Sequence, residues 1–242
     1  FQLSFSAEII DVSMVWDNGV HNGFCDLIHF KGNWYIIFQE SQNLGHWPAP
    51  PGQPQDIARV IKSSDGAITW KSDVVFSYGD EWQTGGNNLS IRPDNVLIAH
   101  SLARNQQDYS NIKNYISLSS DGENWSAPIE CNSPRSFLHD AAWRENNQIY
   151  FVSYAGYDGR TLIRSYDAVN FTTIINNFRP PGVATTNEAA LIFRRNENTA
   201  LTLIRDDTNQ CCWMGTSSGS LVSWTWKNTG VLIGGPRMIE LP

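Results

Sequence analysis

The stretch SSDGAITW at residues 63–70 decides the fold of this chain, because its pattern returns along the sequence. It recurs as SSDGENW at residues 119–125 and, more weakly, as SYDAVNF at 165–171 and TSSGSLVSW at 216–224. A β-prone run precedes each copy and a short extended segment follows it. In a hairpin turn of this kind the Asp side chain accepts hydrogen bonds from turn amides, Gly takes the positive-φ position and the aromatic residue packs onto the sheet. The repeat therefore predicts a turn between two strands, not a site of chemistry.

A second repeated unit precedes each turn and consists of two apolar strands joined by a tight polar link. Its first strands begin at residues 26, 88, 140, 188 and about 236, which is roughly every 50 residues. Four strands in each such repeat are typical of propeller blades, and no long segment shows a convincing helical period. We therefore predict an all-β fold, a β-propeller of four-stranded antiparallel blades, with residues 1–242 forming a single β-propeller domain.

Composition and charge narrow the range of partners. The chain has 242 residues, of which 17% are charged and 12% aromatic, a balance that argues against a disordered chain or a coiled coil. Its formal net charge is −7 and it has no run of Lys or Arg, so we expect no nucleic-acid partner. No apolar stretch approaches the roughly 20 residues of a membrane span, so we expect no membrane insertion. The sequence does not predict an oligomeric state.

The Ser-x-Asp-Gly turns with their closing Trp resemble the Asp-boxes of the sialidase (BNR-repeat) superfamily. A narrower resemblance covers nearly the whole chain: HNGFCDLIHFKGNWY at residues 21–35 and IGGPRMIELP at 233–242 resemble a bacterial group of sialidase-like propeller proteins, mostly of unassigned function. The resemblance implies a six-bladed pattern of which this chain covers about four to five blades, with the C-terminal part truncated. It also implies a ring-closing N-terminal strand, for which residues 7–16 are the candidate. The repeat itself predicts a fifth first strand at 236–240.

Polar residues recur at one level of the predicted blades. In a propeller the first strand of each blade lines the central channel, and the predicted first strands start with Asp26, Asn88, Asp140 and Glu188. The predicted second strands end in four more polar residues, which are Glu40, His100, Tyr154 and Arg205. Packing favours Val or Leu at such positions, so the recurrence predicts a polar channel mouth.

Three carboxylates around one mouth suit glycoside hydrolysis, which needs one acid to protonate the leaving oxygen and a second group as base or nucleophile. We predict Asp26 as base or nucleophile and Glu188 as general acid, with Asp140 tuning their pKa values. Five-bladed arabinanase-like hydrolases place their carboxylates similarly, which is an analogy at the level of the fold. The same residues could instead cap strand ends or bind ordered water in the channel.

Further side chains are candidates for binding a glycan. His139 lies beside Asp140 and, like His100, could face the channel and bind sugar hydroxyls, while Trp47 in the Pro-rich loop 42–55 could stack on a sugar ring. The predicted substrate-binding residues are Glu40, His100, His139, Tyr154, Arg205, Arg237, Trp47 and Asn88. The five His residues show no regular metal-ligand spacing and no phosphate loop or redox pair is present, so we expect no metal and no cofactor.

Sialic acid is a doubtful substrate because the sequence departs from the sialidases that it resembles. The Phe-Arg-Ile-Pro motif of their first blade is replaced by CDLI at residues 25–28. The resemblance offers Arg205 and Arg237 as members of the arginine triad that holds the sugar carboxylate, although Arg205 could equally pair with Glu188 or Asp206.

A non-catalytic carbohydrate- or protein-binding propeller is the second hypothesis, because the same architecture hosts both classes. The arrangement of the carboxylates separates the two. Separations of about 5 to 9.5 Å fit a hydrolase, whereas scattered or Arg-paired carboxylates favour a binding protein.

Overall fold

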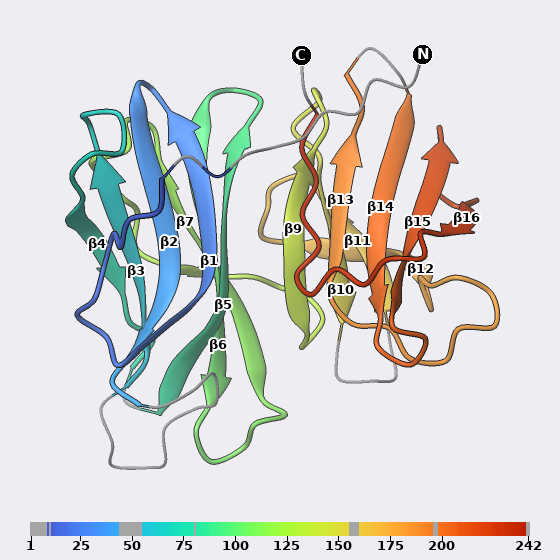
Figure 1. The fold of residues 1–242 in the computed structure, drawn as a ribbon, viewed down its shortest axis with the longest axis horizontal. Helices are drawn as coiled ribbons and strands as arrows, with labels where there is room; N and C mark the ends of the chain where they lie inside the picture. Colours follow the sequence, from blue (N-terminus) through green and yellow to red (C-terminus); the bar gives the residue numbers. More distant parts are fainter. Residues whose placement is uncertain are drawn as a thin grey trace.

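The computed structural model describes residues 9, 11–43, 55–79, 81–154, 160–195 and 198–240. Four antiparallel four-stranded sheets form a four-bladed β-propeller (Figure 1), and the described residues contain no helix. The fold class predicted from the repeat is thus confirmed. No described segment is a helix long and apolar enough to cross a membrane.

Each blade contains four consecutive strands, and its first strand lies on the inside. Blade 1 contains β1 (His21–Phe30), β2 (Asn33–Ser41), β3 (Ile57–Ser63) and β4 (Lys71–Phe76). Blade 2 contains β5 (Trp82–Arg92), β6 (Val96–Asn105), β7 (Ile112–Ser119) and β8 (Ile129–Glu130). Blade 3 contains β9 (Phe137–Trp143), β10 (Ile149–Tyr154), β11 (Arg160–Ser165) and β12 (Phe171–Asn176). Blade 4 contains β13 (Ala189–Phe193), β14 (Thr199–Asp206), β15 (Cys211–Ser218) and β16 (Thr225–Asn228). The inner strands contact one another in sequence: β1 with β5, β5 with β9, and β9 with β13.

The repeated turn joins the third and fourth strands of every blade, as predicted. The carboxylate of Asp65 accepts hydrogen bonds from the backbone amides of Ile68 and Thr69, and Asp121 and Asp167 accept equivalent bonds in blades 2 and 3. The turn also fastens neighbouring blades together. Trp125 in blade 2 packs edge-on against Phe76 in blade 1, with ring centroids 5.8 Å apart.

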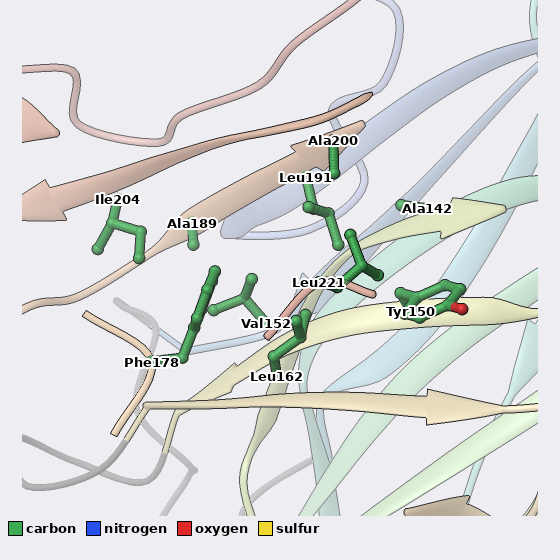
Figure 2. Close-up of a cluster of buried hydrophobic side chains, with 10 residues drawn as sticks. All are labelled: Ala142, Tyr150, Val152, Leu162, Phe178, Ala189, Leu191, Ala200, Ile204 and Leu221. Atoms are coloured by element: carbon green, nitrogen blue, oxygen red, sulfur yellow. The ribbon is translucent and has the colours of Figure 1, made fainter. Parts of the chain in front are cut away.

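In the described part of the chain the hydrophobic core consists of three clusters, and each lies between adjacent blades. Figure 2 shows the one between blades 3 and 4, in which Tyr150 and Leu162 of blade 3 pack with Leu191 and Ile204 of blade 4. The second cluster joins blades 1 and 2 through residues such as Tyr35 and Leu89, and the third joins blades 2 and 3. Burial of this apolar surface fixes how each blade sits against the next one, and with it the position of the inner strands.

The described residues of two expected strands do not form strands. Residues 9 and 11–16, the described part of the expected ring-closing strand, form no strand. Trp16 is held instead by its side chain, whose indole N–H donates to Glu40 at 2.6 Å. Residues 236–240, expected to start a fifth blade, are likewise not a strand. They run beside β9 and β13 (Figure 1) and are held by side-chain contacts rather than by strand pairing.

Candidate functional site

A cavity of about 950 Å³ lies where the inner strands meet. Its walls come from all four inner strands and from the C-terminal segment. The structure brings seven of the predicted site residues to its lining: Asp26, Asn88, His100, His139, Asp140, Glu188 and Arg237. The predicted convergence of polar residues from four blades is therefore present in the fold.

Three of the four inner carboxylate and amide residues are aimed by β-bulges. The pairing register shifts between Gly23 and Asp26 on β1, between Thr84 and Asn87 on β5, and beside Asp140 on β9. A bulge inserts an extra residue, bends the strand and re-aims the neighbouring side chains. The expectation that these residues start their strands was wrong: pairing extends upstream of each bulge, so Asp26, Asn88 and Asp140 lie inside β1, β5 and β9.

Asp26 is held by hydrogen bonds from two blades and from the C-terminal segment. Its carboxylate accepts from the backbone amides of Leu27 at 2.9 Å and Leu89 at 2.8 Å. Both of its oxygens also accept from Nη2 of Arg237, at 2.9 and 2.8 Å. Burial raises the pKa of Asp26, while Arg237 and the two backbone amides act in the opposite direction. The result is a desolvated carboxylate with a fixed orientation.

Asp140 is the most strongly perturbed acid of the cavity. It has a positive φ of 47° at the bulge and is only 8% exposed. Nη1 of Arg237 contacts its Oδ1 at 2.5 Å, and the backbone amide of Leu191 donates to Oδ2 at 3.4 Å. Burial raises its pKa to about 7, because it outweighs the attraction of Arg237 and is reinforced by the negative charge of Asp26. Asp140 therefore exchanges a proton near neutral pH.

Glu188 lies immediately before β13, where its backbone oxygen accepts from the amide of Arg205 at 2.9 Å. Its side chain contacts Nη1 of Arg205 at 3.2 Å. Arg205 also contacts Asp207 at 2.5 Å and donates to the backbone oxygen of Gly234 at 2.7 Å. The predicted pairing with Glu188 is confirmed. The alternative with Asp206 is wrong, because Asp206 accepts instead from the amides of its own turn.

The two histidines of the cavity are neutral. Burial lowers the pKa of His100 to about 3, and its ring packs edge-on against Phe151. Burial also lowers the pKa of His139 to about 4, and the positive charges of Arg160 and Arg237 lower it further. Neutral imidazoles can donate and accept one hydrogen bond each, as sugar hydroxyls require.

Asn88 joins the inner strands of two blades. Its amide nitrogen donates to the backbone oxygen of Leu138 on β9 at 3.3 Å. Its side-chain oxygen is buried and makes no hydrogen bond within the described part of the chain. A buried acceptor without a partner costs folding free energy.

Glu40, Arg205 and Tyr154 are predicted binding residues that do not line the cavity. Trp47 lies outside the described residues. Glu40 is buried in blade 1, where it accepts from Arg59 and Trp16 at 2.6 Å; β1 and β2 pair Asn22 with Glu40 but Asp26 with Ile37, so Glu40 sits well above the level of Asp26. Arg205 contacts the side chains of Glu188 and Asp207. Tyr154 stacks behind the wall on Phe137, with centroids 5.0 Å apart, and burial raises its pKa to about 12.

Phe137 lines the cavity and was missed by the sequence analysis. It lies two residues before His139 on β9, and strand residues two apart share a face. That spacing was the available signal. The guanidinium of Arg104 lies over the ring of Phe137 in a cation–π contact, 4.8 Å from the ring centroid. Within the described residues, no group of three or more His, Cys, Asp or Glu side chains is placed to hold a metal ion.

No protein-family model and no curated protein matches the chain. Among solved structures, the chain is similar to a protein of unknown function from Dyadobacter fermentans DSM 18053, with a TM-score of 0.71, 16% identity, and coverage of 92% of this chain and 72% of that one. It is also similar to the GH43_1 enzyme from Xanthomonas citri complexed with xylotriose (TM-score 0.57, 9% identity, coverage 86% and 73%). The NanB sialidase from Streptococcus pneumoniae gives a TM-score of 0.63 at 10% identity, with coverage of 93% of this chain and 54% of that one. At these identities the similarity concerns the fold.

Proposed function

We propose that this chain is a glycoside hydrolase that binds and cleaves an uncharged glycan in the cavity between its inner strands. The observation that carries the proposal is the convergence of Asp26, Asp140 and Glu188, from three different blades, on one cavity. Similar folds occur in glycan-cleaving propellers, which include GH43 enzymes and sialidases. That similarity supports a glycan as the substrate class. The reaction itself has to be argued from the residues of the site, because one fold hosts many functions.

Each carboxyl group has a distinct role in the proposed reaction. Glu188 donates a proton to the glycosidic oxygen while the bond from this oxygen to the anomeric carbon breaks, and the alcohol leaves neutral. Asp26 either removes a proton from the attacking water or attacks the anomeric carbon itself, to form an ester that water then hydrolyses. Its bonds to Leu27, Leu89 and Arg237 oppose the effect of burial, which raises its pKa, and hold the carboxylate in a fixed orientation for either role. Asp140 tunes the protonation of the other two.

The charges around the cavity favour an uncharged sugar. Arg237 already contacts Asp26 and Asp140, and Arg205 already contacts Glu188 and Asp207. The carboxylate of a sialic acid or a uronic acid would bring a further negative charge beside three acidic side chains. Neutral hydroxyls instead find the neutral imidazoles of His100 and His139 in the cavity lining.

A second candidate function is glycan binding without cleavage, and one observation favours it. The carboxylates of the cavity are all paired with arginines: Asp26 and Asp140 with Arg237, and Glu188 with Arg205. A pairing of this kind suits a binding site whose charges are neutralised in advance.

A panel of neutral chromogenic glycosides, run beside a glycan array, tests both functions. On a substrate that the parent cleaves, Asp26→Asn and Glu188→Gln should each reduce kcat by at least about 100-fold with unchanged circular dichroism. The matched control is Asp94→Asn, which alters an exposed carboxylate paired with Arg92 in a turn of blade 2. Full activity in both variants refutes the hydrolase assignment. Glycan binding by a parent that cleaves nothing favours the second candidate, and neither binding nor cleavage refutes both.

A further inference from the structure

The C-terminal segment at residues 231–240 lies across the cavity and is anchored at several points other than Arg237. The backbone oxygen of Val231 accepts from the amide of Cys212 at 2.8 Å. The backbone oxygen of Gly234 accepts from Arg205 at 2.7 Å, and the carboxylate of Glu240 accepts from the amide of Arg195 at 2.8 Å. These anchors fix the segment on blade 4, and from it the side chain of Arg237 reaches Asp26 of blade 1 and Asp140 of blade 3.

The guanidinium of Arg237 bridges two carboxylates. Nη2 contacts Asp26 on β1, and Nη1 contacts Asp140 on β9. Because the guanidinium is a rigid planar fork, these contacts place the nearest oxygens of the two carboxylates within about 8 Å of each other. Arg237 is 44% exposed, yet both of its terminal nitrogens face protein carboxylates. It is therefore poised to act through the aspartates rather than on a ligand.

We propose that Arg237 is a positioning residue of this site: it holds Asp26 and Asp140 in a fixed relative orientation and decides which of them carries a proton. The consequence for turnover rests on the function proposed above. The effect on the two aspartates themselves does not.

Among the charged groups around Asp26 and Asp140, Arg237 is the one that contacts both carboxylates. Burial raises the pKa values of Asp26 and Asp140, and the positive charge of Arg237 lowers both. The negative charge of Asp26 raises the pKa of Asp140 further. The neighbouring His139 on β9 is neutral above its pKa of about 4 and supplies no countercharge. Arg205 on β14 is already engaged by Glu188 and Asp207. Without Arg237, two buried carboxylates this close would share a proton, because ionising both is costly.

The direct test follows the carboxyl groups by ¹³C NMR in protein labelled at aspartate. Removing the positive charge with Arg237→Gln should raise the titration midpoint of Asp140 by about one to three pH units, and Asp26 should titrate together with it. Arg237→Met is a second charge-free variant that keeps the apolar stem, for use if the Gln variant does not fold. Arg237→Lys keeps a positive charge, so the titration midpoint of Asp140 should rise less than in Arg237→Gln. The control Arg92→Gln removes an arginine from a surface ion pair with Asp94 and should leave both midpoints unchanged.

A role as a mere tie between blades 1 and 3 predicts a different result. The charge-free variants would then lose thermal stability while the midpoints of Asp26 and Asp140 stayed where they are in the parent, and that outcome overturns the proposal. If the parent cleaves a glycoside, the acidic limb of its pH profile should move with the NMR midpoints. A parent without turnover whose midpoints still shift in Arg237→Gln refutes the hydrolase and retains the role of Arg237.

Discussion

Replacing Asp140 with Asn should stabilise the folded protein at neutral and alkaline pH. Burial raises the pKa of Asp140 to about 7, whereas the same carboxyl group in an unfolded chain titrates near 3.8. Each pH unit between these values corresponds to about 1.4 kcal/mol, so ionised Asp140 costs the folded state up to about 4 kcal/mol. The attraction of Arg237 is already contained in that pKa. Asn has nearly the same shape, carries no charge and also tolerates the positive φ of 47° at this bulge.

The stabilisation should depend on pH in a defined direction. Well below pH 3.8 the carboxyl group of Asp140 is protonated in both states, and parent and variant should be nearly equally stable; at pH 4 the difference is still small. As the pH rises from 4 to 7 the unfolded parent loses its proton first, so the parent loses stability relative to Asp140→Asn. Above pH 7 to 8 both states of the parent are ionised, and the difference should level off at about 2–4 kcal/mol.

Urea denaturation of both proteins at pH 4, 5, 6, 7 and 8 measures this difference. Asp121→Asn is the matched control with the opposite sign. Hydrogen bonds from the amide and side chain of Asn124 and the amide of Glu123 lower the pKa of Asp121, so its neutral replacement should lose stability throughout this range. An Asp140→Asn variant that is less stable than the parent at pH 8, or whose advantage is the same at pH 4, would refute the reasoning.

Three further predictions concern the glycines of the repeated turns, the buried ion pair of Glu40 and the two histidines of the cavity. Gly122→Ala should cost about 2–4 kcal/mol in thermal unfolding, because its Cβ would collide with the Tyr35 hydroxyl, whereas Gly66→Ala, with the same positive φ and nothing within 4 Å, should cost about 1–2 kcal/mol; equal losses would show that the contact is unimportant. Glu40→Gln should destabilise the protein by about 2–4 kcal/mol by leaving Arg59 without its buried partner, with glycan turnover or binding unchanged, since Glu40 lies outside the cavity. The imidazole resonances of His100 and His139 should not titrate between pH 5 and 8, because burial lowers their pKa values to about 3 and about 4, and an NMR midpoint near 6.5 for either would contradict their assignment as neutral residues.

Much of the fold could be predicted because its signals are local. The turns at Asp65, Asp121 and Asp167 depend on residues a few positions apart, so the sequence shows their chemistry directly. The spacing of the apolar runs then indicated four-stranded blades. Once the blades are in place, the inner strands line the central channel, so a polar side chain on an inner strand is expected to lie at this channel. That is why Asp26 and Glu188 could be assigned to one cavity.

The parts that could not be predicted depend on strand register and on distant contacts. A bulky residue in the left-handed region, such as Phe24 with a φ of 52°, gives no signal of a bulge in the sequence. Without the bulges, Glu40 was expected at the level of Asp26, whereas the register places it opposite Asn22. The bond between Arg237 and Asp26 joins residues 211 positions apart, and no local pattern can indicate such a pair.

The arginine pairing that favours a binding protein is also compatible with catalysis, because the two functions differ in proton distribution rather than in contacts. A hydrolase needs one ionised carboxylate and one protonated acid at the same pH. Asp26 accepts two backbone hydrogen bonds and the Arg237 guanidinium, all of which favour its ionised form. Asp140 has the same guanidinium but a pKa of about 7, so it is partly protonated at neutral pH and, in its tuning role, adds less negative charge around Glu188, the proposed proton donor. A binding protein has no use for that proton, so a titration of Asp140 near its ordinary value of 3.8 would remove the main electrostatic argument for catalysis.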